Sequence, residues 1–235
     1  SIWLATVVVS GISYLSYLLK RYVFHESGTL VSGIIGGLYS STATISVLAR
    51  KSRKASEQEA TDYVAAMLLA VSMMFLRFMI LILIFSREIF LSIYPYLLTM
   101  AVVAAIVAWF IHSRQKRPEG QSAETEEDDS SNPLEFKVAL IFAILFVIFT
   151  FLTHYTLVYA GTGGLNLLSF VSGFSDITPF ILNLLQNTGS VAALIITACS
   201  MQAIISNIMV NMFYALFFAC LLYTSDAADD LIGVD

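Results

Sequence analysis

Seven long apolar stretches dominate this sequence and leave little choice of fold class. Each has roughly the 20 mostly apolar residues that an α-helix needs to cross the hydrocarbon core of a bilayer. They cover residues 2–24, 28–49, 60–85, 88–112, 134–158, 164–186 and 190–219. Apolar residues make up 58% of the chain and charged residues only 12%, whereas a soluble domain has about 25% charged residues. The sequence therefore predicts an all-α, polytopic bundle of about seven transmembrane helices in a lipid bilayer.

A polar linker at 113–133 divides these stretches into two groups. It contains six acidic residues between Glu119 and Asp129, and a composition this polar favours a solvated segment without a packed core. We therefore expect a first membrane half of four spans at 1–112 and a second half of three spans at 134–219.

The last residues, 220–235, break the apolar pattern. They resemble the translated adapter read-through that ends many metagenomic reading frames; the alternative is a natural polar tail. We interpret them as non-native, so that the chain is a fragment whose second half is truncated, and the sequence leaves open whether the parent has an eighth span. Two helix starts are marked elsewhere: Ser56 and Glu59 have the spacing of a capping box, and Asn132-Pro133 precedes the fifth stretch as a cap followed by a proline at the first helical position.

The distribution of lysine and arginine predicts how the chain is oriented, because basic residues gather on the cytoplasmic side. If all seven stretches cross the membrane, eight basic residues lie on one side and three on the other. We therefore expect a bacterial inner-membrane protein with a cytoplasmic N-terminus and a cytoplasmic 113–133 linker. The larger group is Arg50, Lys51, Arg53, Lys54, Arg114, Lys116, Arg117 and Lys137, and the smaller group is Lys20, Arg21 and Arg87.

Several classes of function are disfavoured by the sequence. It contains no nucleophile elbow, zinc-protease motif, Walker loop or paired-aspartate protease pattern, and no basic patch suited to nucleic acid. Its two cysteines and three histidines do not have metal-ligand spacing. We expect no enzymatic activity and no cofactor, and the sequence does not define a metal site.

A short internal similarity links the two halves. Residues 37–43 (Gly-Leu-Tyr-Ser-Ser-Thr-Ala) align with residues 173–179 (Gly-Phe-Ser-Asp-Ile-Thr-Pro) at a constant offset of 136 positions. Because four predicted spans separate the copies, this count predicts a parallel repeat. The alternative is chance similarity between two helices rich in glycine and serine.

The second stretch combines small residues with hydroxyls. Gly33 and Gly37 form a small-xxx-small pair that allows another helix to approach closely. The hydroxyls either line an ion pathway at a broken helix, or bond back to the preceding turn of an ordinary packed helix. These hydroxyl residues are Ser40, Ser41, Thr42, Thr44 and Ser46.

The sixth stretch contains Asp176 near its middle. A charge there costs about 2.5–3.5 kcal/mol on insertion scales, so it normally has a partner or a water path. Pro179 disfavours helix at Thr178, and either Asp176 or Thr178 is suited to cap a second half-helix. The sequence predicts a broken helix with Asp176 as a cation ligand or proton acceptor; the alternative is a cap or ion-pair partner only.

Other polar side chains also lie within apolar stretches. Arg77, in the third stretch, either pairs with Asp176, attracts an anion or extends toward the interface. Asn183, Asn207 and Asn211 either supply oxygen ligands for a hard cation together with Asp176, or form interhelical amide hydrogen bonds.

These segments resemble a known family in their order along the chain. The most specific is Gly36-Gly-Leu-Tyr-Ser-Ser-Thr-Ala-Thr-Ile-Ser46, with Met74–Arg77, 132–135, 172–179 and Ser206-Asn207 in support. Together they resemble the membrane domain that follows the MgtC-like domain in MgtC/SapB-type bacterial proteins. The resemblance implies an association with magnesium homeostasis by neighbourhood only. It departs where the family usually has a second acid, at Thr178, and often has a lysine, at Asn211.

Two functions follow as hypotheses. The first is a transporter or channel-like protein for a small ion, with Asp176 as ligand, Ser40, Thr42 and Thr178 as polar lining, and Arg77 as counter-ion. The second is a regulatory or structural membrane subunit without transport activity. In that case the faces around Gly33/Gly37 and Ser169/Gly173 bind partner helices, from a second copy of the chain or from an MgtC-like domain.

Overall fold

The computed structural model describes residues 28–53, 55–114, 136–186 and 191–220, with the single residues 7, 11 and 14. This part of the chain is helical and contains no strand. Most of the predicted first span, the 113–133 linker after Arg114, and the residues after Cys220 lie outside it. The helices are α2 (Thr29–Ser52), α3 (Glu57–Phe85), α4 (Arg87–Ser113), α5 (Phe136–Ser172), α6 (Ile177–Gln186) and α7 (Ala193–Cys220).

Five of these helices, all but the shorter α6, are long and apolar enough to cross a membrane. The protein is therefore an integral membrane protein. Its outward-facing surfaces agree with this, because large apolar side chains such as Trp109 on α4 and Tyr159 on α5 are exposed, and a bilayer is the solvent that favours such a surface.

The antiparallel pair α3 and α4 forms the frame of the bundle. The predicted capping box is confirmed at the start of α3: Ser56 accepts from the Glu59 N–H, and the Glu59 carboxylate accepts from the Ser56 N–H. Ser86 ends α3 and its hydroxyl accepts from the Ile89 N–H in the first turn of α4. Deep between the helices, the Ser72 hydroxyl donates to the Ala101 carbonyl at 2.9 Å.

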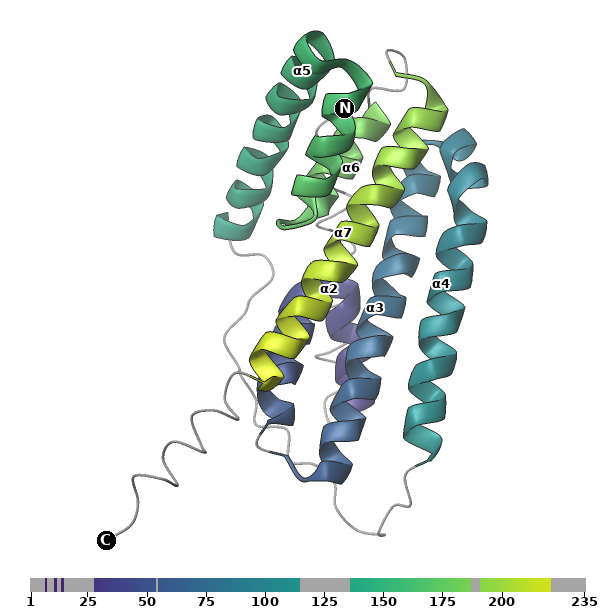
Figure 1. The fold of residues 1–235 in the computed structure, drawn as a ribbon, viewed down its shortest axis with the longest axis vertical. Helices are drawn as coiled ribbons and strands as arrows, with labels where there is room; N and C mark the ends of the chain where they lie inside the picture. Colours follow the sequence, from purple (N-terminus) through teal and green to yellow (C-terminus); the bar gives the residue numbers. More distant parts are fainter. Residues whose placement is uncertain are drawn as a thin grey trace, which may run out of the picture.

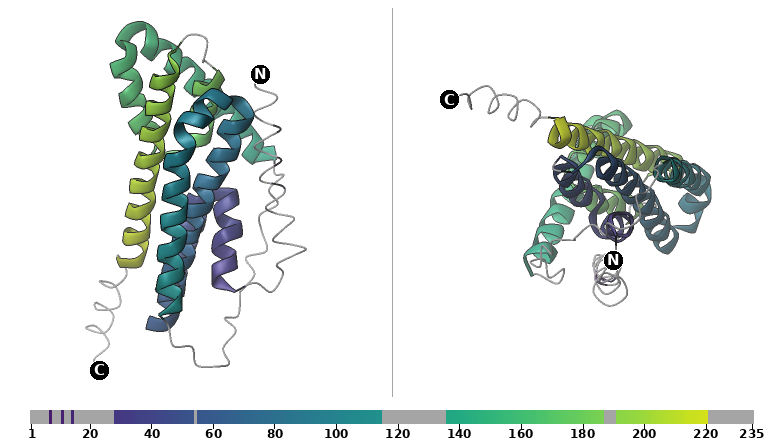
Figure 2. Two further views of the ribbon diagram at one scale, coloured as in Figure 1. Left: turned by 90° about the vertical axis from the view of Figure 1, so that its right-hand side faces the viewer. Right: turned by 90° about the horizontal axis from the view of Figure 1, so that it is seen from below.

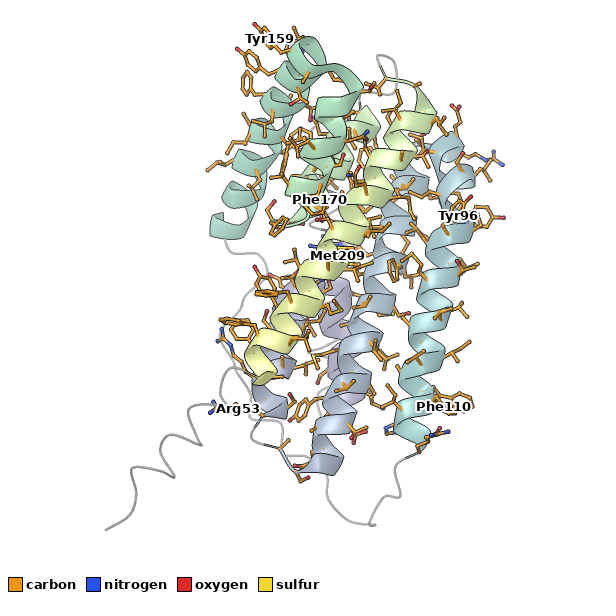
Figure 3. The ribbon with its side chains drawn as sticks, in the orientation of Figure 1. Arg53, Tyr96, Phe110, Tyr159, Phe170 and Met209 are labelled. Atoms are coloured by element: carbon orange, nitrogen blue, oxygen red, sulfur yellow. The ribbon has the colours of Figure 1, made fainter. Side chains whose placement is uncertain are left out.

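Two ends of the bundle are useful as reference points (Figure 3). The Arg53 end holds the connection from α2 to α3 and the last turn of α4 with Phe110. The Tyr159 end, opposite to it, holds the far turn of α5. At the Arg53 end, the imidazole of His112 lies 2.7 Å from the carboxylate of Asp62.

The chain of α2 reverses direction at Ser40. The first leg runs parallel to α3, because Gly33 lies against Ala66 and Gly37 lies against Ala70. The second leg must return toward the Arg53 end, because Ser52 is only a short connection away from the start of α3 at Glu57. α2 is therefore a helical hairpin that enters and leaves at the Arg53 end.

A second hairpin comes from the opposite end (Figure 1). α5 rises to the Tyr159 end and turns at Gly161, whose φ of 59° and ψ of −148° interrupt the helix. The following leg, 162–172, runs beside α7 in the same direction, since Asn166 bonds Cys199 and Phe170 bonds Ser206. After residues 173–176, α6 runs back toward the start of α7. Residues 177–185 are all buried.

These two hairpins correct the predicted topology. Residues 28–49 and 164–186 have the length and apolarity of spans, but each is folded back on itself and does not cross as a single helix. The direction predicted for the internal similarity is also wrong. With α2 re-entrant, only three crossings (α3, α4 and the first part of α5) separate the similar segments, so the two hairpins approach from opposite ends.

The count of crossings that placed the N-terminus in the cytoplasm assumed a crossing at 28–49, and the structure removes that basis. α7 descends beside α2 and α4 (Figure 2). Near its last turn the Arg50 guanidinium of α2 lies 4.4 Å from the centre of the Phe218 ring. The main apolar core is formed by α3, α4, α5, α6 and α7 and encloses the second hairpin, while the first hairpin packs on α3 through Gly33 and Gly37.

Candidate functional site

The tip of the first hairpin is built by Ser40 and its neighbours. Ser40 has extended φ and ψ of −156° and 106°, and its hydroxyl accepts from the Ala43 N–H at 3.4 Å, so it caps the returning leg. The Thr44 hydroxyl donates to the Ser40 carbonyl at 2.8 Å. Across the hairpin, a Cβ on Gly36 would lie 2.5 Å from the Thr44 hydroxyl oxygen. A glycine is therefore needed at position 36 for the legs to come together.

The hydroxyls predicted as pathway lining divide into two groups. Thr44 and Ser46 donate to the carbonyls four residues earlier, at 2.8 Å each, as in an ordinary packed helix. Ser41 is buried and Thr42 is half-buried; both start the returning leg next to Ser40. The polar surface at this tip therefore comes from Ser40 and Thr42, which are half-buried.

The tip of the second hairpin carries Asp176. Its Oδ1 accepts from the Thr178 N–H at 2.9 Å, so of the two residues that the sequence suited to a cap, Asp176 is the one that caps α6. Its side chain is exposed, while the Thr178 side chain behind it is buried. Asp176 thus keeps a charge accessible at a tip where Phe174 and Ser175 are exposed as well.

Arg77 of α3 joins the two tips. Its Nη1 donates to the Tyr39 carbonyl at 2.8 Å, immediately before Ser40. Its Nη2 donates to the Thr178 hydroxyl at 3.4 Å, in the first turn of α6. A helical side chain leans toward the N-terminus of its own helix, and this lean brings the guanidinium back to the level of the tips.

The sequence left open whether Arg77 pairs with Asp176, attracts an anion or extends toward the membrane interface. Arg77 is only 9% exposed, so it does not extend toward the interface. Arg77 and Asp176 form no ion pair within 4 Å, since the Arg77 guanidinium donates to Tyr39 and Thr178 instead. Both oxygens that Arg77 contacts are neutral, and its Nε has no hydrogen-bond partner.

The asparagines do not assemble into one cluster with Asp176. Asn183 donates to the Thr150 hydroxyl of α5 at 2.8 Å. Asn207 donates to the Gly173 carbonyl at 3.0 Å, and Asn211 donates to Asn207 at 3.2 Å. The Asn183 contact is the interhelical amide bonding that the sequence offered as an alternative, whereas Asn207 bonds the turn between α5 and α6 and Asn211 bonds within α7. In the part of the chain that the structure describes, no three His, Cys, Asp or Glu side chains are arranged to hold a metal ion.

The small residues fit helices of the same chain. A Cβ on Gly33 or Gly37 would clash with the α3 backbone at Ala66 or Ala70, and a Cβ on Gly173 would clash with Ser206 of α7. These faces, which the second hypothesis assigned to partner helices, are therefore occupied within the molecule. The sequence reading missed Gly36 and the Tyr39 carbonyl. A Gly-Gly pair four residues before a hydroxyl cluster was the available signal for a tight hairpin.

Replacing Gly173 with alanine should destabilise the fold by about 1–3 kcal/mol, the usual cost of overpacking. The added methyl carbon would collide with the Ser206 side chain and lie 2.8 Å from the backbone nitrogen of Asn207. We expect Ser206→Gly to recover part of the loss, because it removes the side-chain component of the clash. Unfolding midpoints of the two single variants and the double variant in detergent measure this coupling, and strictly additive losses would contradict the contact.

These observations define a class: a helical membrane protein in which two re-entrant hairpins, entering from opposite ends, meet at a buried arginine. The chain belongs to a family described as a domain of unknown function, DUF4010, whose model matches residues 7–219. It is also 26% identical over 201 residues to an "Uncharacterized protein" of Aquifex aeolicus, covering 83% of this chain and 84% of the relative. No solved structure matches it. The association with MgtC/SapB-type proteins rests on the sequence resemblance alone.

Proposed function

We propose that this protein is a transporter or channel-like protein for a small ion, which passes between the tips of the two hairpins. The observation that carries the proposal is the meeting of both tips at Arg77. Non-helical backbone at membrane depth is tolerated only where it is enclosed by protein or lines a water-filled cavity. Interrupted helices facing each other at the middle of a bundle are a common architecture of ion and substrate sites in transporters.

An inverted repeat is part of this proposal. Gly37 packs on Ala70 in the first half and Gly173 packs on Ser206 in the second, and both members of the second pair follow those of the first by 136 positions. At the same offset, Ser40 and Asp176 each cap the returning leg. In each half, moreover, a side chain of the neighbouring helix donates to a backbone carbonyl of the tip. Arg77 of α3 donates to Tyr39, and Asn207 of α7 donates to Gly173. Two such units of opposite orientation can rock against each other to alternate access to a shared site.

The side chains at the tips would have different roles in ion passage. Ser40, Thr42 and Thr178 supply neutral oxygens, Asp176 supplies an accessible negative charge, and Arg77 holds the tips together and supplies a positive charge. Magnesium remains a candidate ion through the resemblance. We further propose an inner-membrane location with the Arg53 end cytoplasmic, because Arg50, Lys51 and Arg53 and the start of the basic segment at Arg114 lie there.

The experiment that tests transport is ion flux into proteoliposomes containing the purified protein. Mg²⁺, other divalent cations, Na⁺, H⁺ and small anions are screened, with Asp176→Asn beside the wild type. Asparagine caps a helix about as well as aspartate, so the variant should keep its fold. Removing the charge should change the flux of the transported ion by about tenfold or more, downward for a cation. Protein that is folded in the liposomes and conducts none of these ions would refute the proposal.

A further inference from the structure

The positive charge of Arg77 is not neutralised by any group in contact with it. An arginine has five N–H donors and no acceptor. Here two of its nitrogens meet the neutral oxygens of Tyr39 and Thr178, at 2.8 and 3.4 Å. The third, Nε, has no partner although the side chain is only 9% exposed. A buried charge without a counter-charge is costly, and proteins normally supply it with an ion partner.

Asp176 does not fill this role by direct contact. It forms no ion pair with Arg77, its Oδ1 is engaged by the Thr178 N–H at 2.9 Å, and its side chain is exposed. The returning legs of both hairpins also begin here, at Ser41 and Ile177, and the N-terminal end of a helix favours negative charge. The unpaired Nε and these two helix starts therefore favour the same kind of ligand.

The geometry points to a small anion, such as a halide or a compact oxyanion, as the missing counter-charge of Arg77, bound beside its guanidinium where the two hairpin tips meet. Because Arg77 as a whole is only 9% exposed, the ligand must be small. This inference deepens the proposed transport function, on which it rests for its biological meaning, by assigning the class of ion. Its ligand is recognised by charge-assisted hydrogen bonding from the guanidinium. Asp176, close by and of the same sign as the ligand, weakens binding and eases release.

The test uses the whole purified protein in nanodiscs of zwitterionic lipid, so that no anionic headgroup competes. Unfolding midpoints are followed in sodium chloride, nitrate, acetate or sulfate, with sodium gluconate holding ionic strength constant, because a ligand that binds the folded state raises its midpoint. We expect a saturable rise with at least one anion. Arg77→Gln should weaken the apparent affinity about tenfold or more, since it removes the charge, and Asp176→Asn should strengthen it.

The matched control is Arg87→Gln, which removes an exposed arginine at the start of α4 and should leave the anion response unchanged. If Arg77→Gln does not fold, Arg77→Lys keeps the charge but loses the Nε donor, and should still weaken the response. The inference is overturned by no anion response, by an unchanged response in the folded Arg77 variant, or by a weaker response in Asp176→Asn. Cation flux that Asp176→Asn abolishes, with no anion response, would leave transport standing without the anion site. Anion binding without flux of any ion would leave the anion site standing and refute the transport function.

Discussion

Gly37→Ala is expected to lose about 3 kcal/mol of stability or to fail to accumulate as folded protein. The added Cβ would lie 2.5 Å from the Ala70 Cα and 2.6 Å from the Ala70 carbonyl oxygen. Both are backbone atoms of α3, so no side-chain rotation relieves the clash. The first leg of the hairpin would have to move away from α3, and the contact between Arg77 and the Tyr39 carbonyl would be lost with it.

Gly163→Ala is the matched control. Gly163 also lies in the leg of a hairpin, but a Cβ there meets nothing within 4 Å, and alanine in a helix is favoured over glycine by up to about 1 kcal/mol. This variant should be as stable as the wild type or slightly more stable. Unfolding midpoints and the recovery of monodisperse protein after heating in detergent compare the two variants. Equal midpoints for Gly37→Ala and Gly163→Ala would show that the hairpin is not packed on α3 as described.

Arg77→Met is expected to abolish ion flux while lowering stability by only about 1–3 kcal/mol. Methionine replaces much of the apolar stem, but it leaves the Tyr39 carbonyl without its donor, and an unsatisfied buried acceptor costs about that much. The functional loss should be larger, because the two tips are no longer tied to one another and the positive charge between them is gone. The predicted signature is therefore folded protein without activity.

Flux of whichever ion the screen identifies, measured beside the unfolding midpoint of the same preparation, separates the two effects. Arg87→Met is the control, since Arg87 is exposed at the start of α4 and its loss should change neither quantity much. If Arg77→Met conducts like the wild type, the bridge between the tips is not part of the transport pathway. If it conducts less only in proportion to the protein that remains folded, Arg77 has a structural role alone.

The helical signals in the sequence were informative because they depend on local chemistry. The capping box at Ser56 was predicted from two residues, and it formed because both hydrogen bonds lie within one turn. A broken helix was one of two alternatives for the second stretch and the prediction for the sixth, and the structure interrupts both, at Ser40 and at residues 173–176. Pro179 itself lies in the first turn of α6, and Thr178, where the proline was expected to disfavour helix, is helical. The prediction that Thr44 lines an ion pathway, by contrast, depended on the orientation of its hydroxyl. That hydroxyl donates to the Ser40 carbonyl at the start of its own helical leg.

What the sequence by itself determined is the class of protein, its helical content and the positions where helices are interrupted, since these follow from apolarity, capping and proline chemistry. The tertiary structure alone decided whether each interruption is a kink or a reversal. Both use the same glycine, serine and proline residues, and the difference lies in what the second leg packs against. For α2 that choice is set by Gly33 and Gly37 on α3, and it turned two expected crossings into hairpins of opposite orientation. Only then does Arg77, distant in sequence from both tips, lie between Tyr39 and Thr178.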